Sequence, residues 1–128
     1  MDVRLITKSG VEERGVEELP LLLQGEDGLV WVDIPADDEE AEHVLSEVFR
    51  FHPLAVKDAM ERNRVPKMHA YHDHVFVILH APERGKHGHV HYIELDQFYW
   101  CALLGDGAWT RQSGRPPRCC LAGDSRGA

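Results

Sequence analysis

The apolar residues of the chain follow two spacings, one typical of strands and one of helices. Residues 3–7 alternate at every second position, which predicts a strand near a sheet edge with Ser9 and Gly10 in its turn. Residues 29–34 form a nearly continuous apolar run of strand formers, typical of a strand covered on both faces. Between these strands, residues 16–24 carry leucines at helical spacing and predict a short helix with a proline in its first turn.

A second helix is predicted between residues 37 and 49. Asp37 can cap its start, and Glu40 stands three residues later, as in a capping box. The apolar residues that follow recur with the helical period and would face the core; they are Ala41, Val44, Leu45, Val48 and Phe49.

Two prolines define a third helix within residues 52–71. Pro53 has no N–H to lose, and its fixed φ suits the first turn of a helix. Pro66 biases the preceding residue away from helical conformation, so the helix should end near Asn63 and lead toward an apolar strand at 75–79. We expect one side of this helix to carry Leu54, Ala55, Asp58 and Ala59.

The following segments predict a hairpin and complete the fold class. Strands are expected at 74–80 and 88–98, joined by the turn-forming residues 81–86. The order of strand, helix, strand, two helices and hairpin predicts an α/β domain with a mixed β-sheet flanked by helices. A chain of 128 residues with 43% hydrophobic content can hold one domain with a modest core.

Charge and hydropathy narrow the classes of partner. The formal net charge of −8 disfavours nucleic acid and anionic membrane surfaces, and it suits cations. No window approaches the about 20 apolar residues that a membrane-spanning helix needs, so we expect no membrane span in this chain. The first residues lack a basic segment followed by an apolar one, so we expect no secretory signal and a cytoplasmic location.

Several motifs stand in an order that resembles a known family. In chain order they are a Trp-x-Asp strand, an acidic helix, the motif His-Pro-Leu-x-x-x-Asp-Ala, the motif Arg-x-x-x-Pro-Lys, a tyrosine and an apolar strand. The strand motif begins at Trp31, the two longer motifs begin at His52 and Arg62, the tyrosine is Tyr71, and the apolar strand begins at Val75. This order resembles the cytoplasmic N-terminal domain of CorA-type magnesium/cobalt transporters, over about residues 1–98. The resemblance implies a CorA-like soluble domain, divalent cations as partners, and a homo-oligomer like the CorA pentamer on the cytoplasmic side of a membrane.

The resemblance is incomplete. CorA proteins share a C-terminal membrane hairpin with a Gly-Met-Asn signature, and this sequence contains neither. The chain is therefore expected not to transport ions alone.

The pattern changes after Phe98. Residues 105–128 show no helical or alternating period, and all three cysteines and two of the three tryptophans follow Phe98. We predict a domain at 1–98 and an irregular tail at 99–128, because such a composition buries little apolar surface.

The tail also suggests an origin. A back-translation from Tyr99, read one nucleotide out of register, gives Tyr-Leu-Val-Thr-Val-His-Gly-Pro, which resembles the strand that follows Leu-Asp-Gln-Phe in CorA domains. We hypothesise a frameshift after Phe98 that replaced the rest of a CorA-like transporter. The sheet would then lack a strand beside 88–98, be incomplete at its C-terminal side, and be marginally stable and prone to aggregate.

Asp58 is the first candidate metal ligand. The resemblance implies that its carboxylate helps form a regulatory Mg²⁺ site between neighbouring subunits, and Mg²⁺ favours carboxylate oxygens. The long helix that would offer the opposing ligand is absent from this sequence. The alternative is a surface ion pair between Asp58 and Arg62, four residues later on the same helix.

Three histidines are the second candidate. His87, His89 and His91 alternate along the strand predicted at 88–98 and would project to one face, where imidazoles can bind Zn²⁺, Ni²⁺ or Cu²⁺. A solvated strand face would show the same spacing.

The sequence leaves three classes of function open. No nucleophile motif, phosphate-binding glycine loop or dinucleotide fingerprint occurs, so we expect no enzyme and no organic cofactor. The chain could be the regulatory, metal-sensing and oligomerising part of a CorA-like Mg²⁺/Co²⁺ transporter, a free-standing His-rich metal-binding protein, or a nonfunctional fragment.

Overall fold

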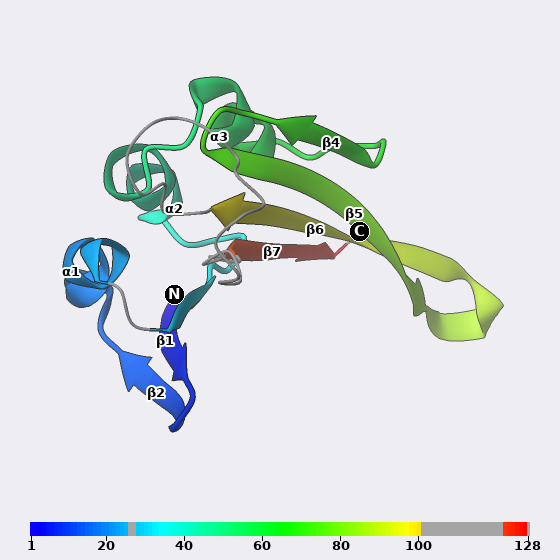
Figure 1. Cartoon of the computed structure of the whole chain (residues 1–128). Helices are drawn as coiled ribbons and strands as arrows, with labels where there is room; N and C mark the ends of the chain where they lie inside the picture. The colour runs from blue at the N-terminus through cyan, green and yellow to red at the C-terminus, as the bar shows by residue number, and fades with distance from the viewer. Residues whose placement is uncertain (26–27, 101–121, 128) are drawn as a thin grey trace.

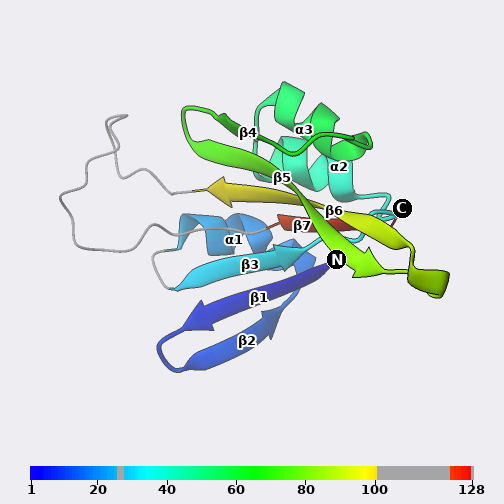
Figure 2. The same ribbon diagram turned by 90° about the vertical axis from the view of Figure 1, so that its right-hand side faces the viewer.

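The protein forms a mixed seven-stranded sheet with its helices gathered on one face (Figure 1). The structure is a computed structural model that describes residues 1–25, 28–100 and 122–127. The strand order is β2-β1-β3-β7-β6-β5-β4, so β2 and β4 form the two edges. Figure 2 shows the sheet from the side opposite the helices, where the described part of the chain places no helix over it. The α/β class predicted from the residue pattern is confirmed.

The first three strands form an antiparallel group at one end of the sheet. β1 (Asp2–Thr7) pairs with β2 (Gly10–Arg14) on one side and with β3 (Leu29–Asp33) on the other. The predicted strands at 3–7 and 29–34 are confirmed as strands, whereas β2 was not expected. The expectation that residues 29–34 are covered on both faces is wrong, because only alternate side chains of β3 are buried. In β1 and β3 every second side chain is buried, so one face of each strand packs on the core and the other does not.

The helices before residue 50 follow the predicted apolar stripes. η1 (Val16–Glu18) and α1 (Leu19–Gln24) form the first short helical segment, with Pro20 in the first turn of α1. α2 (Ala41–His43) continues into the wider π-helical turn η2 (Val44–Val48), where the N–H of Phe49 donates to the carbonyl of Val44. The predicted stripe is confirmed as part of the core or packed against it. The predicted cap at Asp37 is wrong, because the carboxylate of Asp38 accepts the Glu40 N–H instead.

The helix α3 (Pro53–Met60) begins at the predicted proline and ends earlier than expected. The Nδ1 atom of His52 accepts the Leu54 N–H at 3.1 Å, which caps one of the free donors of the first turn. The expected side of Leu54, Ala55, Asp58 and Ala59 is not uniform, since Ala55 and Ala59 are buried and the side chain of Leu54 is 61% exposed. The buried side is formed by Ala55, Val56 and Ala59.

The C-terminal hairpin is longer than the sequence predicted. β5 (His74–Arg84) and β6 (Val90–Trp100) pair antiparallel over their full length, and η3 (Lys86–Gly88) lies in the connection. The turn predicted at 81–86 is thus displaced toward residues 85–89. On its other side β5 pairs with β4 (Lys67–Ala70) only up to Ile78, and beyond that residue no strand of the described residues lies there. Pro82 is tolerated there because it costs no hydrogen bond to a second neighbour.

One strand of the tail completes the sheet. β7 (Ala122–Gly127) runs between the two halves, parallel to β3 and antiparallel to β6. The predicted irregular tail is wrong for residues 99–100, which belong to β6, and for residues 122–127. The prediction that the sheet lacks a strand beside β6 is wrong as well, because β7 occupies that place. Residues 101–121, with the three cysteines and Trp109, lie outside the described part of the chain.

A single apolar core lies between the sheet and the helices. Its largest fully buried apolar side chains are Leu19, Phe76, Ile78 and Phe98, contributed by α1, β5 and β6. Phe51 stacks on Phe98 with ring centroids 4.4 Å apart, so the chain just before α3 is packed onto the sheet. None of the helices in the described residues has the length and apolar character needed to cross a membrane.

Candidate functional site

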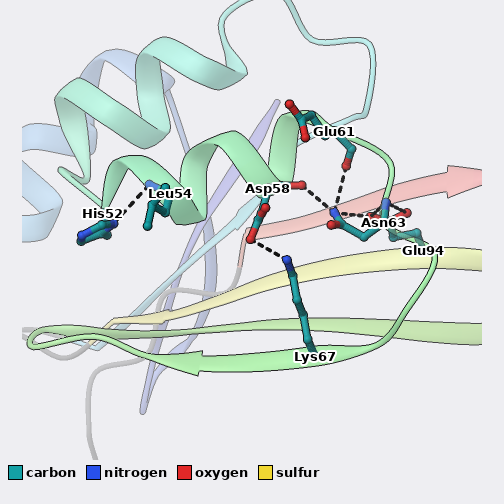
Figure 3. A network of polar contacts seen from close by, with 7 residues as sticks. All are labelled: His52, Leu54, Asp58, Glu61, Asn63, Lys67 and Glu94. Carbon is teal, nitrogen blue, oxygen red and sulfur yellow. Dashed lines mark hydrogen bonds and ion pairs between the residues drawn. The ribbon is translucent and has the colours of Figure 1, made fainter.

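The carboxylate of Asp58 lies on α3 where the helix faces β4 (Figure 3). Its Oδ2 atom accepts a charge-assisted hydrogen bond from Lys67 Nζ at 2.6 Å. The side chains of Asp58 and Lys67 are 26% and 32% exposed, so both groups remain in contact with solvent. The expected alternative, an ion pair between Asp58 and Arg62, is wrong. α3 ends at Met60, so Arg62 is not one helical turn away from Asp58.

Asn63 holds the loop between α3 and β4. Its Nδ2 atom donates to the carbonyl oxygens of Asp58 at 2.7 Å and of Glu61 at 3.0 Å, which satisfies acceptors at the helix end. The same nitrogen approaches Glu94 Oε1 at 3.1 Å, and the Asn63 backbone N–H lies within 3.0 Å of both carboxylate oxygens of Glu94. Figure 3 shows this side chain between the helix end and β6. These hydrogen bonds therefore hold Asn63, in the middle of the loop, in one position.

Glu94 is a buried acid whose partner is this loop. Only 4% of its surface is exposed, and burial of a carboxylate is costly unless hydrogen bonds compensate. Both of its oxygens are within hydrogen-bonding distance of the Asn63 backbone N–H, and Oε1 is also close to the Asn63 amide. Glu94 thus anchors the loop and has little remaining capacity to bind a metal.

The geometry around Asp58 limits what this chain can bind by itself. Within the described residues, no group of three His, Cys, Asp or Glu side chains is arranged to hold a metal ion. Mg²⁺ uses one or two carboxylates and keeps several waters, so one accessible carboxylate is a partial site. Further ligands would have to come from outside the described residues. A cation would also have to replace Lys67 as the partner of Asp58.

The three candidate histidines do not share a strand face. His87 lies in η3 with a positive φ of 60°, and His89 follows that turn, so only His91 belongs to β6. The predicted alternation is wrong because the turn falls later than expected and takes up the first two residues. All three side chains are exposed. Their affinity for Zn²⁺, Ni²⁺ or Cu²⁺ stays a prediction.

Another histidine, His74 at the start of β5, holds the residue that precedes α3. His74 is buried, and its Nε2 atom accepts the His52 N–H at 3.3 Å, while Nδ1 lies 2.6 Å from a carboxylate oxygen of Asp73. This pattern assigns the ring proton to Nδ1. The Tyr71 ring stacks on the rings of both His52 and His74. These contacts fix the direction from which the chain enters the helix that carries Asp58.

Sequence reasoning missed Lys67, Asn63 and Glu94. Lys67 was seen only as part of a motif, and its pairing depends on β4, which was not predicted. Asn63 was taken only as the end of the helix. Glu94 did carry a signal, because it stands inside a predicted strand between Ile93 and Leu95, where a charged residue needs a partner.

Comparisons with known proteins agree with this fold and with the motif order. The family described as "CorA-like Mg2+ transporter protein" matches residues 26–98. A protein of Bacillus subtilis (strain 168) named "Putative metal ion transporter YfjQ" is 28% identical over 78 residues, which are 59% of this chain and 24% of that protein.

A solved structure, that of the full-length CmaX protein, superposes with a TM-score of 0.69 at 12% identity. The match covers 98% of this chain and 34% of that structure, and at this identity it supports the fold alone. The chain thus spans about a quarter of the curated relative and about a third of the solved one.

Proposed function

Because the chain belongs to the CorA-like Mg²⁺ transporter family, we propose that it is the cytoplasmic regulatory part of a divalent metal ion transporter. In this proposal the domain senses Mg²⁺ or Co²⁺ through Asp58 and associates with further copies of itself. In this proposal the domain controls the transport step, and the transport step itself belongs to the membrane-spanning part of the transporter.

The observation that carries the proposal is the pair between Asp58 and Lys67. The carboxylate is solvent-accessible, sits on a helix anchored at both ends, and is neutralised by one lysine that also remains partly exposed. A hard divalent cation and an ammonium group compete for the same carboxylate oxygens. At low metal concentration Lys67 holds Asp58, and at high concentration the cation replaces it and recruits ligands from a neighbouring copy.

Calorimetric titration of the full 128-residue chain with MgCl₂ tests the metal site. We expect millimolar binding that Asp58→Asn abolishes, since the amide carries no negative charge for the cation. Lys67→Gln should tighten binding about tenfold, because the competing ammonium group is gone. Sedimentation of the same samples should show larger assemblies with Mg²⁺ than without it.

A matched control distinguishes competition between Lys67 and Mg²⁺ from the effect of a change in net charge. Lys57 is exposed and adjacent to Asp58 in sequence, and Lys57→Gln changes the net charge by the same amount. This control should leave Mg²⁺ affinity within about twofold of the parent chain, since surface charges act weakly through solvent. Equal tightening by both variants, or no heat from the parent chain at millimolar metal, would remove the proposed site.

The out-of-frame origin of the tail is a separate proposal. The family match stops at residue 98, the position after which the apolar pattern changes, and this supports it. Reading the gene beyond codon 98 tests it directly. An alternative frame without a strand and a membrane hairpin would end the hypothesis.

A further inference from the structure

A cavity lies beside the loop that joins α3 to β4, away from the carboxylate of Asp58. It has a volume of about 390 Å³ and is lined by Arg62, Asn63, Arg64, His80, Tyr92 and Glu94. Ligand sites in proteins span roughly 300 to 1,000 Å³, so the cavity is large enough for a small organic molecule. The loop forms one wall, and the hairpin β5–β6 forms the other.

The charge of the cavity is opposite to that of the whole chain. Arg62 and Arg64 are exposed, and within the described residues neither guanidinium has a hydrogen-bond or ion-pair partner. Glu94 is occupied by Asn63, which leaves its negative charge buried and hydrogen-bonded. Two arginines without a partner in the described residues thus line one cavity in a chain of net charge −8.

The position of the two arginines is fixed by the residue between them. Asn63 bonds to the end of α3 and to β6, so the backbone that carries both arginines cannot shift easily. A guanidinium binds phosphate oxygens through parallel hydrogen bonds, and two of them match the two charges of a phosphate monoester. A carboxylate ligand carries one negative charge and would neutralise only one of the two guanidinium groups.

The hairpin wall adds an aromatic surface. The rings of His80 and Tyr92 lie 6.3 Å apart at an angle of 41°, and Tyr92 is 56% exposed. The Nε2 atom of His80 lies 3.0 Å from the Asn63 carbonyl, so this ring is also fixed to the loop. A flat ring of a ligand can pack on Tyr92 while its anionic group reaches the arginines.

We propose that this cavity binds a nucleoside monophosphate or a ligand of the same chemistry, with the phosphate on Arg62 and Arg64 and the base on Tyr92. The site is separate from Asp58 and goes beyond metal sensing. Asn63 connects the two, because it bonds both to Glu94 in the cavity wall and to the Asp58 carbonyl.

Titration of the full chain with AMP, inorganic phosphate, adenosine and benzoate tests the assignment. AMP should bind at least tenfold more tightly than each of the other three, since only AMP carries both a dianion and a flat base. Arg62→Gln and Arg64→Gln should each weaken AMP binding by at least fivefold. Tyr92→Leu should weaken AMP binding and leave phosphate binding unchanged, because it removes only the stacking surface.

Two controls keep the test independent of folding and of the metal site. Arg50→Gln alters an exposed arginine before the other end of α3 and should leave AMP affinity unchanged. Asp58→Asn should also keep AMP binding, so a failed metal site and a failed cavity give different results. The proposal is overturned if AMP does not bind, if inorganic phosphate, adenosine or benzoate binds as tightly as AMP, or if both arginine variants bind AMP like the parent chain.

Discussion

Asp58 and Glu94 both bond to Asn63, Asp58 through its backbone carbonyl and Glu94 through its carboxylate, and the surroundings of their two carboxylates differ in almost every respect. Asp58 is partly exposed and pairs with one flexible lysine. Glu94 is buried and bonded to the backbone and side chain of Asn63. An exposed ion pair contributes little to stability and exchanges partners readily, whereas a buried carboxylate with fixed donors is costly to disturb.

This difference assigns separate roles to the two carboxylates: Glu94 anchors the loop, and Asp58 is available to bind a ligand. The free energy that fixes the loop should come mainly from Glu94 and Asn63, and this leaves Asp58 available for other partners. A carboxylate that held the fold could not also exchange Lys67 for a cation without loosening the domain. The predictions below test this division.

The largest effect is expected for Glu94→Ala. The variant leaves the Asn63 N–H without its acceptor and opens a space in the loop wall, so the free energy of unfolding should fall by about 3 kcal/mol. Urea denaturation of both chains measures it. Glu83→Ala, an exposed glutamate in the same hairpin, should change stability by less than about 0.5 kcal/mol. Similar losses for both variants would mean that Glu94 is no anchor.

A smaller loss is expected for Asn63→Ala. The backbone N–H still reaches Glu94, but the helix end loses the amide that binds the carbonyls of Asp58 and Glu61, at a cost of about 1 to 2 kcal/mol. Asn63→Asp should be worse than the alanine variant, because a new carboxylate then faces the two carbonyls and the carboxylate of Glu94. Urea denaturation gives both values, and an aspartate variant as stable as the parent would contradict the bonding described.

The ion pair between Asp58 and Lys67 should contribute still less. A double-mutant cycle with Asp58→Ala and Lys67→Ala should give a coupling energy of about 0.5 kcal/mol, as expected for partly exposed pairs. In 1 M NaCl most of this coupling should disappear, because salt screens exposed charges. A coupling above about 2 kcal/mol would place Asp58 among the anchors and weaken the competition with metal.

The smallest effect on stability is expected for Asp38. Its carboxylate lies outside the loop and serves as a reference for Asp58 and Glu94. The Glu40 N–H and, next, the N-terminal ammonium group lower the pKa of Asp38 below its ordinary value of 3.8. A depressed pKa contributes stability that is present above the unfolded pKa and is lost as the pH falls through the folded one. The stability difference between the parent chain and Asp38→Asn should therefore shrink below pH 3.8 in acid titrations of unfolding. A difference that is constant with pH would rule out a charge effect.

The elements that depend on neighbours in sequence were predictable. Pro53 starts α3, and the helical period of Ala41, Val44, Leu45 and Phe49 gives the core side of the preceding helix. These features depend on capping and on side chains one or two turns apart, which the local sequence contains. The family was also indicated by the order of motifs along residues 31–79.

The candidate site was predictable only in part. Asp58 was identified, and its partner was not, because Arg62 falls beyond the actual helix end while Lys67 comes from an unexpected strand. His87 and His89 were placed on a strand that begins at Val90. In both cases an error of a few residues at an element boundary changed which side chains share a face.

The sequence by itself determined the types of the main elements, the apolar side of the first long helix and the family, because these follow from short-range periodicity and motif order. Only the tertiary structure decided that Lys67 holds Asp58, that Asn63 joins α3 to β6, and that Arg62 and Arg64 line one cavity with Tyr92. The physical reason is that such contacts depend on strand register and on the exact residue at which a helix ends, and both are settled by packing across the whole sheet.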